Sequence, residues 1–168
     1  MRGAVDLNAL YTASYRRLVV QVYALSGDLS EAEDAVQEAF VIAIQHARRL
    51  DAVDNPEAWL RTVAVNRIRA RWRHSRVVRR LQPRLVRPTT MVEVGPDHVA
   101  LVRALQQLDP DVRHAVVLHH LADLGIADVA AELGIAEGTV KSRLARARTR
   151  LSALLDERAD ETEEPRHV

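Results

Sequence analysis

The first half of the chain carries apolar residues three or four positions apart, which predicts amphipathic helices over residues 6–26, 30–47 and from 56 onward. Ser30, followed three residues later by Glu33, is typical of a capping box and predicts the start of the second helix. Residues 50–55 should form a loop, because a residue before proline is pushed out of the helical region. Asn55 is then the expected N-cap of the helix that Pro56 opens.

Residues 77–96 interrupt this periodicity and contain three prolines and a glycine, which predicts a linker between two domains. Beyond it, apolar spacing predicts helices over residues 97–108 and 110–121, and Asp109 is the expected cap of the second.

The stretch that follows is typical of a helix-turn-helix. A short apolar segment, residues 126–133, meets a break at Gly134, and a second helix runs from about 137 past 151. Ala130 is small enough for a close helix crossing, and Gly134 permits a tight turn. Seven apolar positions fall where both helices would face a common core: Val129, Leu133, Ile135, Val140, Leu144, Ala147 and Leu151.

We therefore predict an all-α protein with two small helical domains joined by a flexible linker. The expected boundaries are 7–76 for the first domain, 77–96 for the linker and 97–155 for the second domain. An acidic tail at 156–168 is expected to be disordered. With one Phe, three Tyr and two Trp in 168 residues, aliphatic helical bundles are favoured over a β-sandwich.

The net charge of +1 conceals a segregation of charge along the sequence. Residues 28–38 form an acidic cluster, whereas residues 58–92 hold ten arginines and no acid. The second helix of the helix-turn-helix is also free of acids from 138 to 155. Separate basic blocks indicate separate polyanion contacts, and the acidic block indicates a cationic partner or a solvated surface. A cationic, hydroxyl-bearing helix face suits major-groove reading, although an ordinary helical hairpin could carry the same charges.

The sequence does not contain the residue patterns that disulfides, metal sites, catalytic sites or membrane spans would need. The absence of cysteine excludes disulfides and thiolate metal sites. Histidines occur at 114, 119 and 120, but adjacent positions on a helix point in different directions, so we expect no metal site. No catalytic constellation or phosphate-binding loop is present, and we expect no cofactor. No apolar run is long enough to span a bilayer, and the first residues do not form a signal-peptide core, which favours a cytoplasmic protein.

Together the segments resemble a known family. Ala32-Glu-Asp-Ala-Val-Gln-Glu-Ala-Phe40, the Pro56-Glu-Ala-Trp-Leu helix with its arginines, and Gly138-Thr-Val-Lys-Ser-Arg-Leu144 follow one another in the order seen in sigma-70 family RNA polymerase sigma factors of the extracytoplasmic-function (ECF) type. The likeness covers about residues 7–76 and 97–155, matching the parts of that family called region 2 and region 4.

The resemblance implies a role for each segment. The acidic helix would dock on a coiled coil of the polymerase β′ subunit through Asp34, Gln37, Glu38 and Phe40. The loop and the helix after it would capture and hold the single-stranded promoter −10 element through Asp54, Asn55, Trp59, Asn66, Arg67, Arg69, Arg71 and Arg73. From the residues alone, packing is the simpler explanation of Trp59. The helix-turn-helix would read the −35 element as duplex through Thr139, Lys141, Ser142, Arg143 and Arg146.

The resulting hypothesis is a promoter-specificity subunit of bacterial RNA polymerase, not itself an enzyme, with core polymerase and promoter DNA as partners. The resemblance also allows for an anti-sigma protein as a further partner. The alternative is a stand-alone helix-turn-helix regulator that binds duplex DNA without polymerase. Such a regulator needs neither the acidic helix nor the acid-free arginine run.

Overall fold

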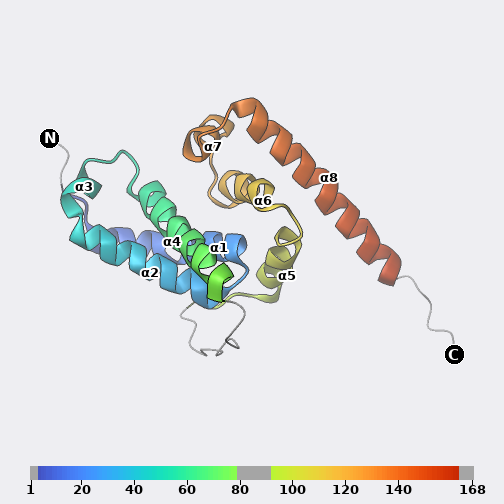
Figure 1. Cartoon of the computed structure of the whole chain (residues 1–168), viewed down its shortest axis with the longest axis horizontal. Coiled ribbons are helices and arrows are strands. Elements are labelled where there is room, and N and C mark those ends of the chain that lie inside the picture. The colour runs from blue at the N-terminus through green and yellow to red at the C-terminus, as the bar shows by residue number, and fades with distance from the viewer. Residues whose placement is uncertain (1–3, 79–91, 163–168) are drawn as a thin grey trace. The chain divides into compact units, whose positions relative to one another are not determined.

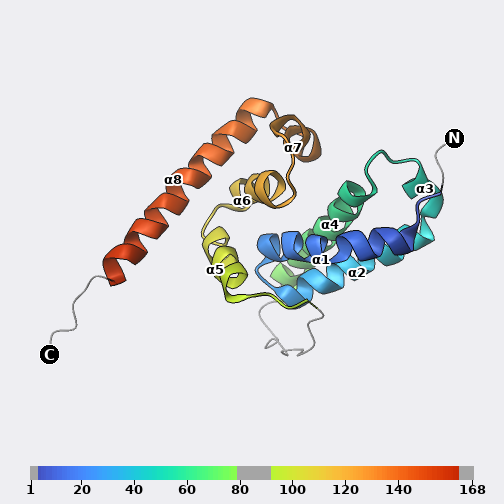
Figure 2. The ribbon, with the colours of Figure 1, turned by 180° about the vertical axis from the view of Figure 1, so that it is seen from behind.

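The computed structural model describes residues 4–78 and 92–162, and every regular element in that part of the chain is helical (Figure 1). Contacts divide the chain into two compact units, Met1–Val94 and Gly95–Val168. The first unit holds α1 (Leu7–Ser26), α2 (Leu29–Gln45), α3 (Ala47–Asp51) and α4 (Pro56–Val78). Figure 2 shows this unit from behind, where α1 and α2 run side by side. The predicted all-α, two-domain fold is confirmed.

The starts of the first two helices depend on aspartate side chains. Asp6 caps α1 by accepting hydrogen bonds from the backbone N–H groups of Asn8 and Ala9, both at 3.0 Å. Gly27, at φ 75°, ends α1. Asp28 then caps α2 by accepting from the N–H of Glu31 at 3.0 Å. The prediction of a Ser30 capping box is therefore wrong.

Alanines let α2 pack closely against its neighbours. Its buried face presents Ala32, Ala35, Val36, Ala39 and Ala43, all fully shielded from solvent. Small side chains allow the helix backbones to approach, and the valines and leucines of α1 and α4 fill the remaining space. The apolar spacing of residues 30–47 also places Ile44 on this core face, and that prediction is wrong, because the side chain of Ile44 is exposed.

The loop predicted at 50–55 is partly helical. α3 occupies Ala47–Asp51 and buries Leu50 completely, while the carboxylate of Asp51 accepts a hydrogen bond from Val5 N–H at 2.7 Å. The predicted Asn55 cap is confirmed: its Oδ1 accepts from Ala58 N–H at 3.0 Å. α3 and this cap fix both ends of the short loop before α4.

One arginine of the acid-free block points inward. Arg61 on α4 is buried and donates from Nη1 to Oε1 of Gln21 on α1 at 3.3 Å. It joins two helices of the core, and its guanidinium does not lie on the surface that a polyanion would meet.

The end of the predicted linker belongs to the first unit. Val92 is buried in the core of that unit, and Val94 packs against it. The backbone N–H of Val92 donates to Oε1 of Glu33 at 2.8 Å, and the side chain of Glu33 is only 4% exposed. Glu33 therefore anchors the returning chain. Residues 79–91 of the predicted linker lie outside the described part.

The second unit holds α5 (Pro96–Leu105), α6 (Pro110–Val116), the π-helical turn η1 (Val117–Leu121), α7 (Ile126–Leu133) and α8 (Glu137–Thr162). The helix predicted over 110–121 thus changes its hydrogen-bonding pattern half-way, as Ala122 N–H bonds to Val117 O at 3.0 Å. Asp109 precedes α6, but its side chain makes no capping hydrogen bond.

α8 is longer than the sequence predicts. Its backbone stays helical through Thr162, so the expectation of disorder from residue 156 is wrong as far as 162, and residues 163–168 lie outside the described part. None of the helices described in the two units combines the length and apolar character that crossing a bilayer requires.

Candidate nucleic-acid interface

The turn between α7 and α8 has the geometry of a helix-turn-helix. Gly134 adopts φ 66° at the end of α7, a conformation that costs glycine little. The N–H of Ile135 bonds back to Ala130 O at 3.0 Å, which completes the turn. The buried residues Val129, Ala130 and Val140 pack α7 against the start of α8. The turn thereby fixes the direction in which the exposed side of α8 faces.

The exposed side of α8 is cationic and polar. Among the predicted reading residues, Thr139, Lys141, Ser142 and Arg146 have exposed side chains. Leu144 and Ala147 are buried and hold the opposite side of α8 in the core. A helix supported along one side, with free donors on the other, can enter a major groove without losing its packing.

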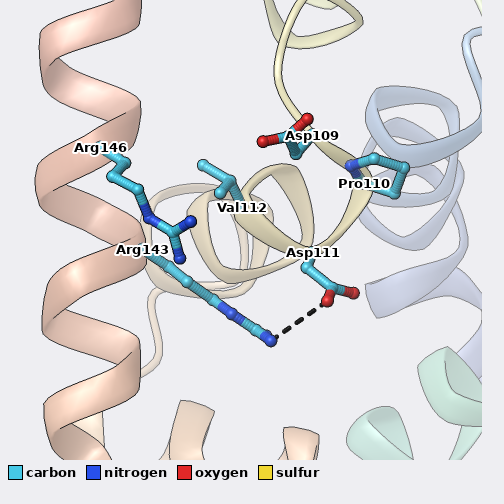
Figure 3. Close-up of a pocket in the computed structure, with 6 residues that line it drawn as sticks. All are labelled: Asp109, Pro110, Asp111, Val112, Arg143 and Arg146. Carbon is cyan, nitrogen blue, oxygen red and sulfur yellow. Dashed lines mark hydrogen bonds and ion pairs between the residues drawn. The ribbon is translucent and has the colours of Figure 1, made fainter.

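Arg143 behaves differently from its neighbours on α8. Its side chain is 15% exposed, and Nη2 lies 3.2 Å from Oδ2 of Asp111, near the start of α6 (Figure 3). Arg143 and Arg146 border a hollow of about 450 Å³ that is also lined by Asp109 and Asp111. Arg143 therefore ties α8 to α6.

A second arginine, Arg113, links α6 to the end of α5 and to the residues that follow it. Arg113 is buried and donates from Nε to Leu105 O at 3.0 Å, from Nη2 to Leu108 O at 3.0 Å, and from Nη1 to Oε1 of Gln106 at 2.8 Å. Burial lowers the pKa of Arg113, but the guanidinium stays charged at neutral pH. The positive charge lies at the C-terminal end of α5, where it interacts favourably with the negative end of the helix dipole.

In the first unit, α2 presents an acidic and partly apolar surface. Asp34, Gln37 and Glu38 are exposed, and so are Val41 (52%) and Ile44 (65%). Asp34, Gln37, Glu38 and Val41 line a hollow of about 620 Å³ together with Ile42, Gln45 and Arg67. Exposed aliphatic side chains on the same helix as these carboxylates are suited to a partner that is both apolar and basic.

The carboxylates of α2 meet arginines of α4. Nη2 of Arg71 lies 2.6 Å from Oε1 of Glu38, and Nη1 lies 4.0 Å from Oδ2 of Asp34. Nε of Arg67 lies 3.7 Å from Oε2 of Glu38. Asn66 and Arg69 on α4 are exposed, so this part of the helix offers both amide and guanidinium groups to solvent.

Comparisons with known proteins show which family the chain belongs to. Residues 10–86 match the family model for sigma-70 region 2, and residues 98–151 match that for sigma-70 region 4. The ECF RNA polymerase sigma factor SigM of Mycobacterium tuberculosis is 37% identical over 152 residues, which cover 87% of this chain and 75% of SigM. The chain belongs to the ECF sigma factors of the sigma-70 family.

Two further similarities agree with this assignment. SigL, another ECF RNA polymerase sigma factor of M. tuberculosis, is 36% identical over 84% of each chain. The solved structure of the sigma factor RpoE from Bartonella quintana, in complex with the anti-sigma factor NepR, matches with a TM-score of 0.72 and 28% identity, covering 90% of this chain and 97% of RpoE. As a sigma factor, the chain gives RNA polymerase its promoter recognition and takes part in transcription initiation. The family favours this function over a stand-alone regulator.

The structure brings most of the predicted site residues of the sigma factor to its surface, but Phe40 is buried, and Trp59, Arg71 and Arg143 are half-buried. Phe40 is 6% exposed, and its ring packs edge-on against Tyr11 at a centroid distance of 5.0 Å, so it supports α2 from inside and does not present a docking side chain on the surface described here. The guanidinium of Arg143 is paired with Asp111, as described above, so this side chain also links α8 to α6, and its contact with the −35 element stays a prediction. Sequence reasoning missed Val41, Ile44 and Asp111.

The predicted −10 residues differ in how far their side chains are exposed. Asp54, Asn55, Asn66, Arg67 and Arg69 are exposed, and Arg71 is half-buried. Trp59 is half-buried and packs against the core, as the simpler explanation of this residue predicts. Arg73 lies on α4, but its side chain is outside the described part.

His119 and His120 pack against each other. The rings of His119 and His120 meet edge to face with centroids 4.7 Å apart, and Nδ1 of His119 lies 2.7 Å from Leu124 O. Across residues 4–78 and 92–162, no three potential metal-binding side chains gather.

Proposed function

We propose that the sigma factor docks on a basic helical segment of core RNA polymerase, the β′ coiled coil, through Asp34, Gln37 and Glu38. To these we add the exposed aliphatic side chains of Val41 and Ile44, and we call the five residues the docking surface. The observation that carries the proposal is the exposure of two aliphatic side chains on α2: Val41, which lines one hollow with the half-exposed carboxylates of Asp34 and Glu38, and Ile44, three residues further along the helix. A partner that buries Ile44 gains hydrophobic free energy, and the carboxylates select a cationic partner.

The DNA contacts follow from the same arrangement. We assign the −10 single strand to the loop at Asp54 and Asn55 and to Arg67, Arg69 and Arg71 of α4, where guanidinium groups neutralise phosphates. The −35 duplex is assigned to Thr139, Lys141, Ser142 and Arg146 on α8, because this exposed face is held rigidly by the turn at Gly134. The sigma factor performs no chemical step; it supplies recognition, and it works where polymerase and promoter DNA are, in the cytoplasm.

An anti-sigma protein is a further proposed partner. RpoE, which resembles this chain over nearly all of its length, was solved with the anti-sigma factor NepR. The exposed docking surface is a site that such an inhibitor can cover, because a surface that must stay open for polymerase stays open for a competitor.

The experiment that tests the docking surface is an Ile44→Ser substitution followed by measurement of the dissociation constant with core polymerase. Burying an aliphatic side chain of this size contributes about 1.5–3 kcal/mol. Because Ile44 is already partly shielded, we expect a loss of about 1–2 kcal/mol, or roughly 5- to 30-fold in affinity, with an unchanged thermal midpoint.

Leu101 offers a matched control. It is an exposed aliphatic residue on α5 of the second unit, 40% exposed, and it is not part of the docking surface. Leu101→Ser should leave the affinity for core polymerase unchanged. Equal affinity of the Ile44→Ser variant and the unaltered protein would rule the docking surface out.

A further inference from the structure

Both ends of the loop before α4 are held by contacts from α1 and from the residue that leads into it. We call residues 52–55 the recognition loop, because its last two residues are assigned above to the −10 single strand. Before the loop, the carboxylate of Asp51 accepts a hydrogen bond from the N–H of Val5 at 2.7 Å. After the loop, Glu57 in the first turn of α4 is bound by Arg17 of α1. These contacts join residues 46 and 40 positions apart, so the fold of the first unit sets the position of the loop.

The contact between Arg17 and Glu57 consists of two hydrogen bonds. Nε of Arg17 donates to Oε1 of Glu57 at 2.8 Å, and Nη2 donates to Oε2 at 2.5 Å. Two parallel bonds between a planar guanidinium and a carboxylate fix the orientation of both groups, which a single bond does not. The side chains are 53% and 24% exposed, so the pair contributes little to overall stability. Its effect is to hold the first turn of α4 against α1.

The first turn of α4 and the recognition loop form one unit. Oδ1 of Asn55 accepts a hydrogen bond from the N–H of Ala58 at 3.0 Å, and Glu57 lies between these two residues in the chain. A restraint on Glu57 is therefore also a restraint on Asn55. Within the loop, Val53 packs against the core, whereas the side chains of Asp54 and Asn55 are exposed. The contacts thus fix the backbone from which two polar side chains face solvent.

We propose that Arg17 is a positioning residue for base recognition: through Glu57 it holds the recognition loop in the shape that presents its two exposed polar side chains to a base. The inference rests on the proposed −10 role of the recognition loop. A base that leaves the stack costs a few kcal/mol, and a loop that had to become ordered at the same moment would add a cost in conformational entropy. Arg17 itself contacts no DNA in this role.

The proposal separates base preference from overall strand binding. An ion pair as exposed as this one changes an equilibrium by about two- to fivefold, and that factor should appear in the preference for the recognised base. Retention of a strand of any sequence depends on phosphate neutralisation by arginines further along α4, so it should stay the same. A residue with a merely structural role would not change base preference alone.

The test measures base preference with the full-length protein bound to core polymerase. The probe is a pool of single-stranded DNAs of about 20 nucleotides with about eight randomised central positions. Bound and unbound fractions are sequenced, which gives an enrichment ratio of the most favoured over the least favoured base. The variants are Arg17→Gln, Glu57→Gln and the double variant, and circular dichroism checks that each is folded. Arg16→Gln is the charge-matched control, because Arg16 is exposed on the same helix and bonds to Glu93 O at 3.5 Å instead of to Glu57.

Arg17→Gln and Glu57→Gln should each lower the enrichment ratio about two- to fivefold, while the total fraction of the pool that is retained stays the same. The double variant should lose no more than the worse single variant, because the two residues act as a unit. Arg16→Gln should leave the ratio unchanged. Losses that multiply in the double variant would overturn the proposal, and so would an unchanged ratio in Arg17→Gln or an equal loss in Arg16→Gln.

One further variant separates this proposal from the −10 role on which it rests. Asp54→Ala combined with Asn55→Asp changes both exposed side chains of the recognition loop, while it keeps the net charge and an oxygen that can cap α4. If this variant retains the enrichment ratio, the loop does not read a base, and the −10 role and the positioning role fail together. If it lowers the ratio but Arg17 and Glu57 show no coupling, the −10 role stands and only the positioning role is overturned.

Discussion

Replacing Arg143 by glutamine distinguishes a structural arginine from a base-reading one. Arg143 is 15% exposed and bonded to the 77% exposed Asp111 at 3.2 Å, so the substitution removes an ion pair and part of a packed aliphatic stem. A partly exposed pair contributes about 0.2–1 kcal/mol, and the lost packing brings the expected cost to about 1 kcal/mol. In a domain of this size that lowers the melting temperature by about 4–8 °C.

The assay pairs thermal unfolding with binding to duplex DNA that carries the −35 element. Arg143→Gln should lower the melting temperature and weaken binding to specific and unrelated duplexes alike. Arg146→Gln, a change to an exposed arginine one turn further along α8, should leave the melting temperature unchanged. It should cost about 1–3 kcal/mol of specific binding if Arg146 contacts a base edge. An Arg143→Gln variant that melts like the unaltered protein but loses discrimination between sequences would refute the assignment.

Further predictions concern three other positions. Glu33→Ala leaves the buried Val92 N–H without its acceptor and should lower the free energy of unfolding of the first unit by about 1–3 kcal/mol, whereas an unchanged urea midpoint would show that the chain is not anchored there. Gly134→Ala places a side chain at φ 66° and should cost about 1 kcal/mol in thermal unfolding, and a neutral result would mean that the turn has another conformation. Partial desolvation, with His119 and Arg148 nearby, lowers the pKa of His120 although the residue is largely exposed, so the folded state disfavours its protonation. The stability that the neutral imidazole of His120 contributes is present above about pH 6.5 and is lost as the pH falls toward the folded pKa. His120→Gln should therefore flatten the decline in urea midpoint between about pH 7 and pH 5. An unaltered decline would contradict this.

Local patterns were sufficient to predict most of the helices. The apolar spacing of α8 and the glycine before it define one buried side and one exposed side, because a helix repeats its direction every three to four residues. The same rule misplaced Ile44. Periodicity gives the direction of a side chain, but it does not tell whether a neighbouring helix extends far enough to cover it.

The contacts that sequence reasoning missed are contacts between distant segments. Ser30 and Asp28 are equally good caps by residue type, and only the backbone after Gly27 favours Asp28. Glu33 was assigned to a local cap, but its carboxylate bonds to Val92, 59 residues away. Arg143 carries the same charge as its neighbours on α8, and only the position of Asp111 on α6 distinguishes it.

The most direct test of the account is transcription in vitro with core RNA polymerase and fragments of the source genome, followed by mapping of the transcript starts. With the protein present, new starts should appear at defined positions that share two upstream sequence elements. Asp34→Lys combined with Glu38→Lys should abolish them while the fold is retained. New starts that persist with this double variant would contradict the docking surface. A protein that binds duplex DNA alone and never alters where polymerase starts would contradict the central claim.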